Sequence, residues 1–145
     1  MSRFRIREVD GAEDAADVEM LHEAIFTVHE WAPLPDTLEG HWWLAWRDDD
    51  AQPVAFAGVI PATLYPRTGY YTRVGVLPTC RGAGLQMRFT RAIEACCRRN
   101  GWRAVVSDTH QNTPSANNFI RAGYRLFEPE KRWAFADSLY WRKDL

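Results

Sequence analysis

The chain has 145 residues, of which 46% are hydrophobic and 26% are charged, an ordinary composition for a soluble globular protein. This length predicts a single domain over residues 1–145. The formal net charge of −1 argues against a bulk nucleic-acid binder, which would usually be clearly basic.

The first half of the chain predicts a strand, a helix and three further strands. Alternating apolar residues predict a strand over 3–9. Apolar residues at helical spacing predict a helix over 11–29, and two prolines then turn the chain into a loop or short helix. Runs of β character over 41–47, 54–64 and 70–76, joined by short turns, predict three antiparallel strands.

The second half predicts two helices, each followed by β structure. A helix over 84–100 precedes a short buried strand over 102–107. Thr113 and Pro114 predict a helix start, with threonine as the N-cap and proline in the first turn. Two C-terminal strands follow, one over 125–127 continuing to 133–136 and the other from 139 onward.

The order of these elements predicts the fold class. It reads β-α-(α)-β-β-β-α-β-α-β-β, and the strand-helix-strand step near residues 70–107 requires a parallel pair. We therefore expect an α/β (α+β) domain with a mixed central sheet, antiparallel N-terminal strands and flanking helices.

The cysteines and the N-terminus indicate in which cellular compartment the protein resides. Cys80, Cys96 and Cys97 form no zinc-binding or Cys-x-x-Cys spacing, so we expect no metal site and a reducing compartment. Residues 1–5 lack an apolar signal core, and no stretch approaches the ~20 apolar residues that cross a bilayer. The sequence predicts a cytoplasmic protein without membrane association.

The segment from Val76 to Leu85 carries the most informative pattern. A strand ends, Arg81 precedes Gly82 and Gly84, and a helix begins. Glycines let the backbone approach a ligand, and the unpaired amides and dipole of a helix N-terminus attract anions such as phosphates. The glycines alone fit an ordinary turn equally well, and the pattern is neither a P-loop nor Gly-x-Gly-x-x-Gly.

This segment resembles the main motif of the GNAT N-acetyltransferase family. That motif reads Arg/Gln-x-x-Gly-x-Gly/Ala after a strand ending in Val-x-Pro, and here Val76-Leu77-Pro78 is followed by Arg81-Gly82-Ala83-Gly84-Leu85-Gln86. Gln86 departs from the pattern and should crowd the pyrophosphate loop slightly. Downstream, Asn112, the small residues at 115–116 and Gly123-Tyr124 resemble the second motif. The resemblance covers nearly the whole chain and is strongest over 70–127.

The resemblance implies acetyl-CoA as cosubstrate, bound where two parallel strands splay apart. It implies that backbone amides from Arg81 to Gln86 hold the pyrophosphate and that Val76 and Leu77 face the pantetheine arm, with the Val76 amide polarising the acetyl carbonyl. The implied cofactor-binding residues are Val76, Leu77, Arg81, Gly82, Ala83, Gly84, Leu85, Gln86 and Asn112.

The resemblance also implies direct attack by the acceptor amine, so Cys80 is not expected to act as a nucleophile. Phe119 stands where many relatives have a tyrosine acid, which leaves Tyr124, Tyr71 or water to protonate the leaving thiolate. The strand at 70–76 offers no carboxylate as a base.

Several groups elsewhere remain as candidate bases. They are Glu30, His29, Ser107, Asp108, His110 and a water-relayed path. The candidate catalytic set is therefore His110, Glu30 and Tyr124.

The acceptor is expected to be a small-molecule or peptide amine, bound near residues 29–31, Trp42, Trp43 and Trp133. A core or dimer-contact role for these tryptophans is an equally good interpretation, and the C-terminal strands could pair in a homodimer. Three other functions stay open: an acyl-CoA-binding module without turnover, a structural protein without ligand, and a modifier of nucleic acid. The last rests on a group of arginines, Arg88, Arg91, Arg98, Arg99 and Arg103.

Overall fold

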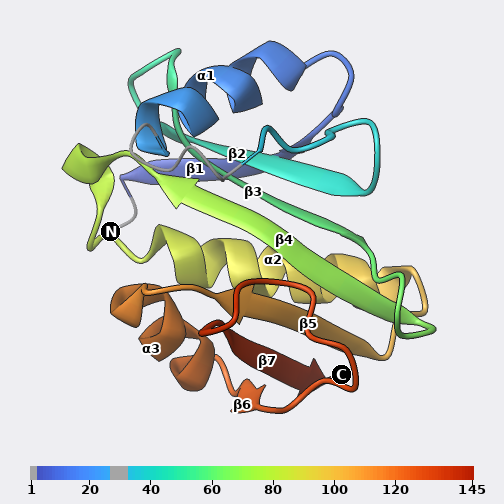
Figure 1. The fold of residues 1–145 in the computed structure, drawn as a ribbon. Helices are drawn as coiled ribbons and strands as arrows, with labels where there is room; N and C mark the ends of the chain where they lie inside the picture. The colour runs from blue at the N-terminus through green and yellow to red at the C-terminus, as the bar shows by residue number, and fades with distance from the viewer. Residues whose placement is uncertain (1–2, 27–32) are drawn as a thin grey trace.

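A mixed sheet of seven strands runs through residues 3–26 and 33–145, the part of the chain that the computed structural model describes (Figure 1). The order is β1-β2-β3-β4-β5-β7-β6, and every neighbouring pair is antiparallel except β4 and β5. The strands are β1 (Phe4–Val9), β2 (His41–Arg47), β3 (Pro53–Pro61), β4 (Thr68–Val76), β5 (Ala104–Thr109), β6 (Arg125–Leu126) and β7 (Leu139–Asp144).

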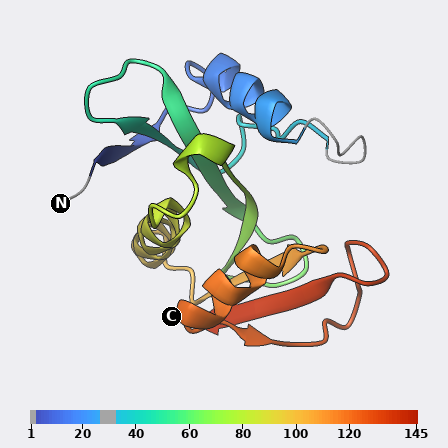
Figure 2. The ribbon, with the colours of Figure 1, turned by 90° about the vertical axis from the view of Figure 1, so that its left-hand side faces the viewer.

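Three α-helices complete this part of the chain and cover both faces of the sheet (Figure 2). They are α1 (Ala15–Ile25), α2 (Leu85–Arg99) and α3 (Thr113–Arg121), and a short 3-10 turn, η1 (Pro78–Cys80), precedes α2. Among the described residues, none of the helices has the length and apolar character needed to cross a membrane. The predicted mixed sheet with flanking helices is confirmed.

Successive side chains of β2 point to opposite faces of the sheet and contribute to a hydrophobic core on each face. Trp42 and Leu44 pack with the apolar residues of α1, whereas Trp43 and Ala45 belong to the core under α2 and α3. Successive side chains of a strand point to opposite faces, so a strand buried on both sides reads as a continuous apolar run. Trp42 and Trp43 are therefore core residues, which favours the core interpretation of these two tryptophans over a place in the acceptor pocket.

The parallel pair separates soon after it forms. Only Thr68, Gly69 and Tyr70 of β4 pair with β5, and beyond them the two strands diverge. The register between β3 and β4 shifts at this point, which leaves Thr72 as an extra residue on β4 and bends the strand as a bulge does. Ser107 donates from Oγ to the Tyr71 carbonyl oxygen at 2.8 Å, at the start of the divergence. The splayed pair implied by the resemblance is confirmed.

Several predicted boundaries differ from the structure. The helix predicted over 11–29 is α1, which begins at Ala15, and the strand predicted over 54–64 is β3, which ends at Pro61. The N-cap of α3 is Asn112, whose side chain accepts from the Ser115 amide at 3.1 Å, so the prediction of Thr113 as the cap is wrong by one residue. The stretch 133–136 is not a strand. Its amides bond to side chains instead, since Ala134 N donates to the Tyr140 hydroxyl at 2.9 Å.

Candidate active site

The loop before α2 forms a cradle of backbone amides. Gly82 and Gly84 have φ angles of 80° and 78°, a left-handed conformation that glycine adopts without strain. The amides of residues 82–87 donate no hydrogen bond to another described residue, and Arg88 is the first to donate back, to Gly84 O. A Cβ added to either glycine would point into open space. The loop thus presents a row of unpaired donors at a positive helix end, which suits a phosphate group.

A cleft of about 510 Å³, here called the cradle cleft, extends from this loop. Its walls come from the end of α1, the end of β4, the cradle and α3. The lining includes Val74, Val76, Arg81, Gly82, Gly84, Leu85, Gln86, Asn112 and Arg121. The two arginines add positive charge beside the amide donors, so the cleft fits a long ligand with phosphates at one end.

The exposed edge of β4 offers further hydrogen-bonding groups. Leu77 donates from its amide to Val54 O on β3 at 2.9 Å, and the amides of an antiparallel strand alternate in direction. The amides of Val76 and Val74 therefore point away from β3, into the gap that opens towards β5. The Val76 carbonyl oxygen accepts from Arg81 Nε at 3.3 Å.

Gln86 joins α2 to α3 at the rim of the cradle cleft. Its Nε2 donates to Ser115 Oγ at 3.1 Å, and its Oε1 accepts from Asn118 Nδ2 at 3.0 Å. The comparison with the family motif predicts that Gln86 crowds the loop slightly. These two bonds draw its side chain towards α3, and its backbone amide remains among the unpaired donors of the cradle.

A second cleft of about 540 Å³, here called the acceptor cleft, adjoins the first. The two share Phe26, Val74, Asn112 and Ser115 in their lining. The acceptor cleft continues along the gap between β4 and β5 to the loop after β5 and the segment 133–135. Ligands in the two clefts would therefore meet beside the free edge of β4.

Asp108 is held within the acceptor cleft by two aromatic donors. Its Oδ2 accepts from the Tyr70 hydroxyl at 2.5 Å and from Trp133 Nε1 at 2.8 Å. Burial and the nearby Asp108 carboxylate raise the pKa of Tyr70, which keeps the phenol a donor. Oδ1 accepts no hydrogen bond from another described residue. The carboxylate is thus fixed in place with one oxygen available to a ligand.

Arg73 is the cation of the acceptor cleft, and its contacts turn it towards α1. Its Nη1 lies 2.6 Å from His22 Nε2 and 3.3 Å from the Pro33 carbonyl oxygen, and its guanidinium lies 5.5 Å from the centre of the Phe26 ring. Burial lowers the pKa of His22 to about 4, and the charge of Arg73 adds to the effect. The neutral imidazole can then accept the hydrogen bond from Arg73.

The structure places two of the predicted catalytic residues, His110 and Tyr124, in different surroundings. His110 lines the acceptor cleft, and its Nε2 lies 2.9 Å from Asp137 Oδ1. Tyr124 is buried against Phe119, at 5.0 Å between ring centres, and lines neither cleft, a position that does not support its predicted role. Phe119 lines the acceptor cleft and cannot donate a proton. Glu30, with His29 and Trp31, lies outside the described residues.

A group of possible metal ligands lies away from both clefts. The ligand atoms of Glu8, His41 and Cys96 lie within 4.8 Å of one another. His41 Nδ1 is 3.2 Å from Glu8 Oε2, and Asn100 Nδ2 is 2.9 Å from His41 Nε2. Arg99 also pairs with Glu8 at 3.6 Å, so a cation there would meet a competing positive charge. Sequence spacing missed this group because its members come from three different elements.

Comparisons with known proteins identify the family of this chain. The model of the acetyltransferase (GNAT) family matches residues 10–124. The chain belongs to this family, and its fold is the GNAT acetyltransferase fold. A comparison with curated proteins gives no match.

Solved structures of similar fold span the whole chain. An acetyltransferase from Streptococcus agalactiae has a TM-score of 0.76 at 15% identity, covering 100% of both chains. A GNAT-family acetyltransferase from Staphylococcus aureus has a TM-score of 0.73 at 14% identity, covering 97% of this chain and 98% of its own. The ribosomal-protein-S18-alanine N-acetyltransferase from Escherichia coli has a TM-score of 0.74 at 10% identity, covering 97% and 93%. At these identities the likeness is one of fold.

Proposed function

We propose that the chain is an N-acetyltransferase that moves the acetyl group of acetyl-CoA to a primary amine. The observation that carries this proposal is the meeting of two clefts at the splayed edge of β4, one of which ends in an amide cradle. Family membership supports acyl transfer in general. The unpaired thiols of all three cysteines support a reducing compartment, and we place the enzyme in the cytoplasm.

In this proposal the cradle cleft binds the CoA part of the cosubstrate. The amides of residues 82–87 and the guanidinium groups of Arg81 and Arg121 bind its phosphates. The outward amide of Val76, which lines the cradle cleft alone, bonds to the pantetheine arm. Acetyl-CoA supplies an activated thioester, whose carbonyl oxygen takes developing negative charge. The outward amide of Val74, which lines both clefts, stabilises that charge in place of the Val76 amide that the resemblance implies.

The transfer itself needs three proton movements. The ammonium group of the acceptor loses a proton, its nitrogen then bonds to the thioester carbonyl carbon, and the C–S bond breaks. The nitrogen gives up its second proton to water, and the thiolate takes a proton from water, which leaves a neutral amide and a thiol. His110, oriented by Asp137 at 2.9 Å, is the described side chain that we assign to the first movement. The presence of Phe119 in the cleft supports water as the acid.

The same phenylalanine supports one competing function, an acyl-CoA-binding module without turnover. Phe119 is 3% exposed and packs at 5.5 Å from Tyr71, whose hydroxyl bonds to Thr90 within the core. Release of CoA thiol in the presence of any amine would eliminate this alternative. The nucleic-acid alternative gains no support, because none of the arginines that motivated it lines either cleft.

Calorimetric titration of acetyl-CoA tests the proposal. We expect binding to the native chain and to Gly101→Asp, and at least about a tenfold loss in Gly84→Asp, where the new carboxylate meets the phosphates. Gly101 is a matched control, because it has a φ of 75°, open space around its Cβ position, and a place at the other end of α2. Equal binding by both variants would remove the cradle from the proposal.

A further inference from the structure

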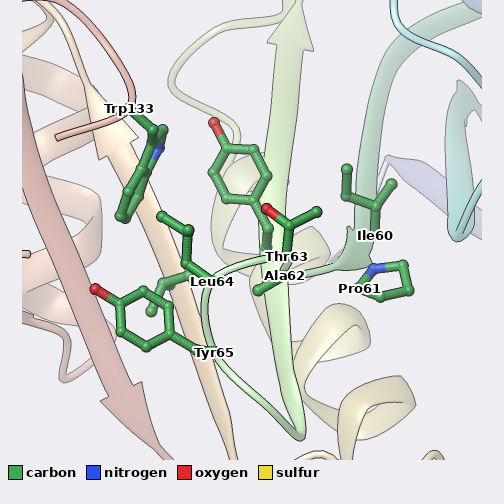
Figure 3. A pocket seen from close by; sticks show the side chains of 9 residues that line it. Ile60, Pro61, Ala62, Thr63, Leu64, Tyr65 and Trp133 are labelled. Carbon is green, nitrogen blue, oxygen red and sulfur yellow. The ribbon is translucent and has the colours of Figure 1, made fainter. Parts of the chain in front are cut away.

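An apolar pocket of about 260 Å³ opens beside the acceptor cleft, next to the paired residues Tyr70 of β4 and Val106 of β5. Its walls come from the end of β3, the turn into β4, and Trp133. The residues that the argument uses are Ile60, Leu64, Tyr65, Tyr70, Val106 and Trp133. Figure 3 shows Trp133 and Ile60 on opposite sides of the pocket, with Thr63 and Leu64 between them.

The size and walls of this pocket suit one aromatic ring. An apolar cavity of about 150 Å³ is enough to hold benzene. Trp133 meets Tyr70 and Tyr65 edge to face, at 5.9 Å and 6.4 Å between ring centres. A further ring would extend this arrangement, which aromatic groups favour beyond simple burial of area.

The apolar pocket joins the acceptor cleft at Asp108. Tyr70 and Trp133 line both spaces, and they are also the two donors that hold Asp108 Oδ2. The carboxylate therefore lies at the junction, with Oδ1 open to a ligand. An ammonium group is the natural partner for such an oxygen, because a charge-assisted hydrogen bond is stronger than a neutral one.

The nearby Arg73 is turned away from the junction towards α1. Its Nη1 is engaged by His22 and by the Pro33 carbonyl oxygen, and its guanidinium lies over Phe26. Burial lowers the pKa of Arg73, and the charge of Asp108 opposes that lowering, so the two side chains interact across the cleft. The junction is therefore aromatic, with the Asp108 carboxylate closest to the apolar pocket.

We propose that the acceptor is an arylalkylamine, with its ring in the apolar pocket and its ammonium group on Asp108 Oδ1. This inference rests on the proposed acetyl transfer and specifies the acceptor class. The ammonium group binds beside the acceptor cleft, which leads to the free edge of β4 where the acetyl group is expected. Asp108 is a binding residue in this scheme, and the proton path remains as described above.

The test compares three amines as acceptors, by the rate of CoA thiol release. We expect kcat/KM for 2-phenylethylamine to exceed that for n-butylamine by about 10- to 100-fold, since only the first buries a ring. Phenylalanine, which adds a carboxylate, should be a poorer acceptor than 2-phenylethylamine. Binding of 2-phenylethylamine to the CoA-loaded protein is measured calorimetrically in parallel.

Two pairs of variants locate the effect. Ala62→Phe fills the apolar pocket and should abolish the preference for the ring, whereas Ala51→Phe, in an exposed turn, should keep it. Asp108→Asn retains an acceptor oxygen for Tyr70 and Trp133 but loses the charge, and should lower kcat/KM for both amines about tenfold. Asp48→Asn, on the exposed turn after β2, should have no effect. Acetyl-CoA affinity should be unchanged in all four variants.

The outcomes separate this inference from the proposed function. Equal rates for the two amines, a ring preference that survives Ala62→Phe, or a preference for phenylalanine would overturn the arylalkylamine assignment and leave acetyl transfer intact. If no amine is acetylated although acetyl-CoA binds, the calorimetric result decides, and the absence of 2-phenylethylamine binding overturns the assignment. Failure of acetyl-CoA to bind would instead overturn the proposed function.

Discussion

At the scale of single residues, the close approach of Trp42 to the backbone of β3 depends on Gly58. The two residues are paired across β2 and β3, and the Trp42 ring is 1% exposed. A Cβ added to Gly58 would lie 2.4 Å from ring atoms Cε3 and Cζ3 of Trp42. A glycine in the middle of a strand is unfavourable by itself, and here it provides the space that the indole occupies.

Gly58→Ala should therefore destabilise the fold through overpacking. We expect a loss of about 1–3 kcal/mol in the free energy of unfolding, measured by urea denaturation. The double variant Gly58→Ala, Trp42→Phe should lose less than the sum of the two single variants, because the smaller ring leaves room for the methyl group. Strict additivity would contradict the proposed contact.

His22 is a buried titratable residue that contacts Arg73, a residue of the acceptor cleft. It is 4% exposed, stacks on Phe26 at 4.7 Å between ring centres, and lies 2.6 Å from Arg73 Nη1. Protonation would place a second positive charge beside Arg73 within the core. For this reason burial and Arg73 together hold the pKa of His22 near 4 in the folded state, below its ordinary value of 6.5.

Stability should consequently fall in mild acid. The folded state binds fewer protons than the unfolded state between these two pKa values, so the stabilising effect is complete above pH 6.5 and is lost as the pH falls through about 4. Urea midpoints at pH 7.5, 5.5 and 4.5 measure this. In His22→Gln, which keeps an acceptor for Arg73, the decline should be shallower; a variant profile parallel to the native one would exclude His22 as its source.

At the scale of elements, the start of α3 combines a structural and a binding role in one residue. Asn112 caps the helix through Ser115 N at 3.1 Å and also lines both clefts. Asn112→Ala should cost about 1 kcal/mol of stability because the cap is lost. Asn112→Asp keeps a capping oxygen and should preserve the thermal midpoint, yet weaken acetyl-CoA binding through its negative charge. Equal thermal midpoints for Asn112→Ala and the native chain would argue against the cap.

Elements with a strong local signal could be predicted closely from the sequence. The strand predicted over 41–47 coincides with β2, whose aromatic and apolar side chains are buried on both faces. The α3 cap was missed by one residue because Asn112 and Thr113 are both good caps, and the choice depends on the backbone angles of Asn112, −135° and 83°. The predicted strand at 133–136 failed because side chains of other elements bind its backbone and its tryptophan.

In the candidate site, too, the part that is local in sequence could be predicted and the part built from distant segments could not. The cradle is local in sequence, so its glycines and helix start were visible in residues 76–86. The acceptor cleft brings Tyr70, Asp108 and Trp133 together from three distant segments. Their contact depends on the parallel pairing of β4 with β5 and on the path of the chain after β6, which no local pattern encodes.

At the scale of the whole molecule, the sheet consists of two parts joined at a narrow place. The part β1–β4 meets the part β5–β7–β6 through only three paired positions at the start of β4 (Figure 2). The helix α2 connects the two parts along the chain, and Gln86 ties α2 to α3. A ligand in the cradle cleft would contact β4 on one side and α3 on the other.

Acetyl-CoA should therefore stabilise the whole fold, because it binds the folded chain across this junction and has no such site in the unfolded chain. At a concentration of 100 times its Kd, the gain is about 2.7 kcal/mol, which corresponds to a rise in Tm of about 5 to 10 °C for a chain of this size. Calorimetric melting with and without acetyl-CoA measures the rise. Gly101→Asp should retain it and Gly84→Asp should lose it.

Hydrogen exchange shows whether this stabilisation acts at the junction. The backbone amides of Val74 and Val76 face the gap and have no partner on β3, so they should exchange readily in the free protein and slowly with acetyl-CoA bound. Amides of β1 and β2, far from the cleft, should change only by the global increase in stability. Uniform protection across all strands would mean that the ligand stabilises the fold without bridging β4 to α3, and it would then have to bind outside the gap.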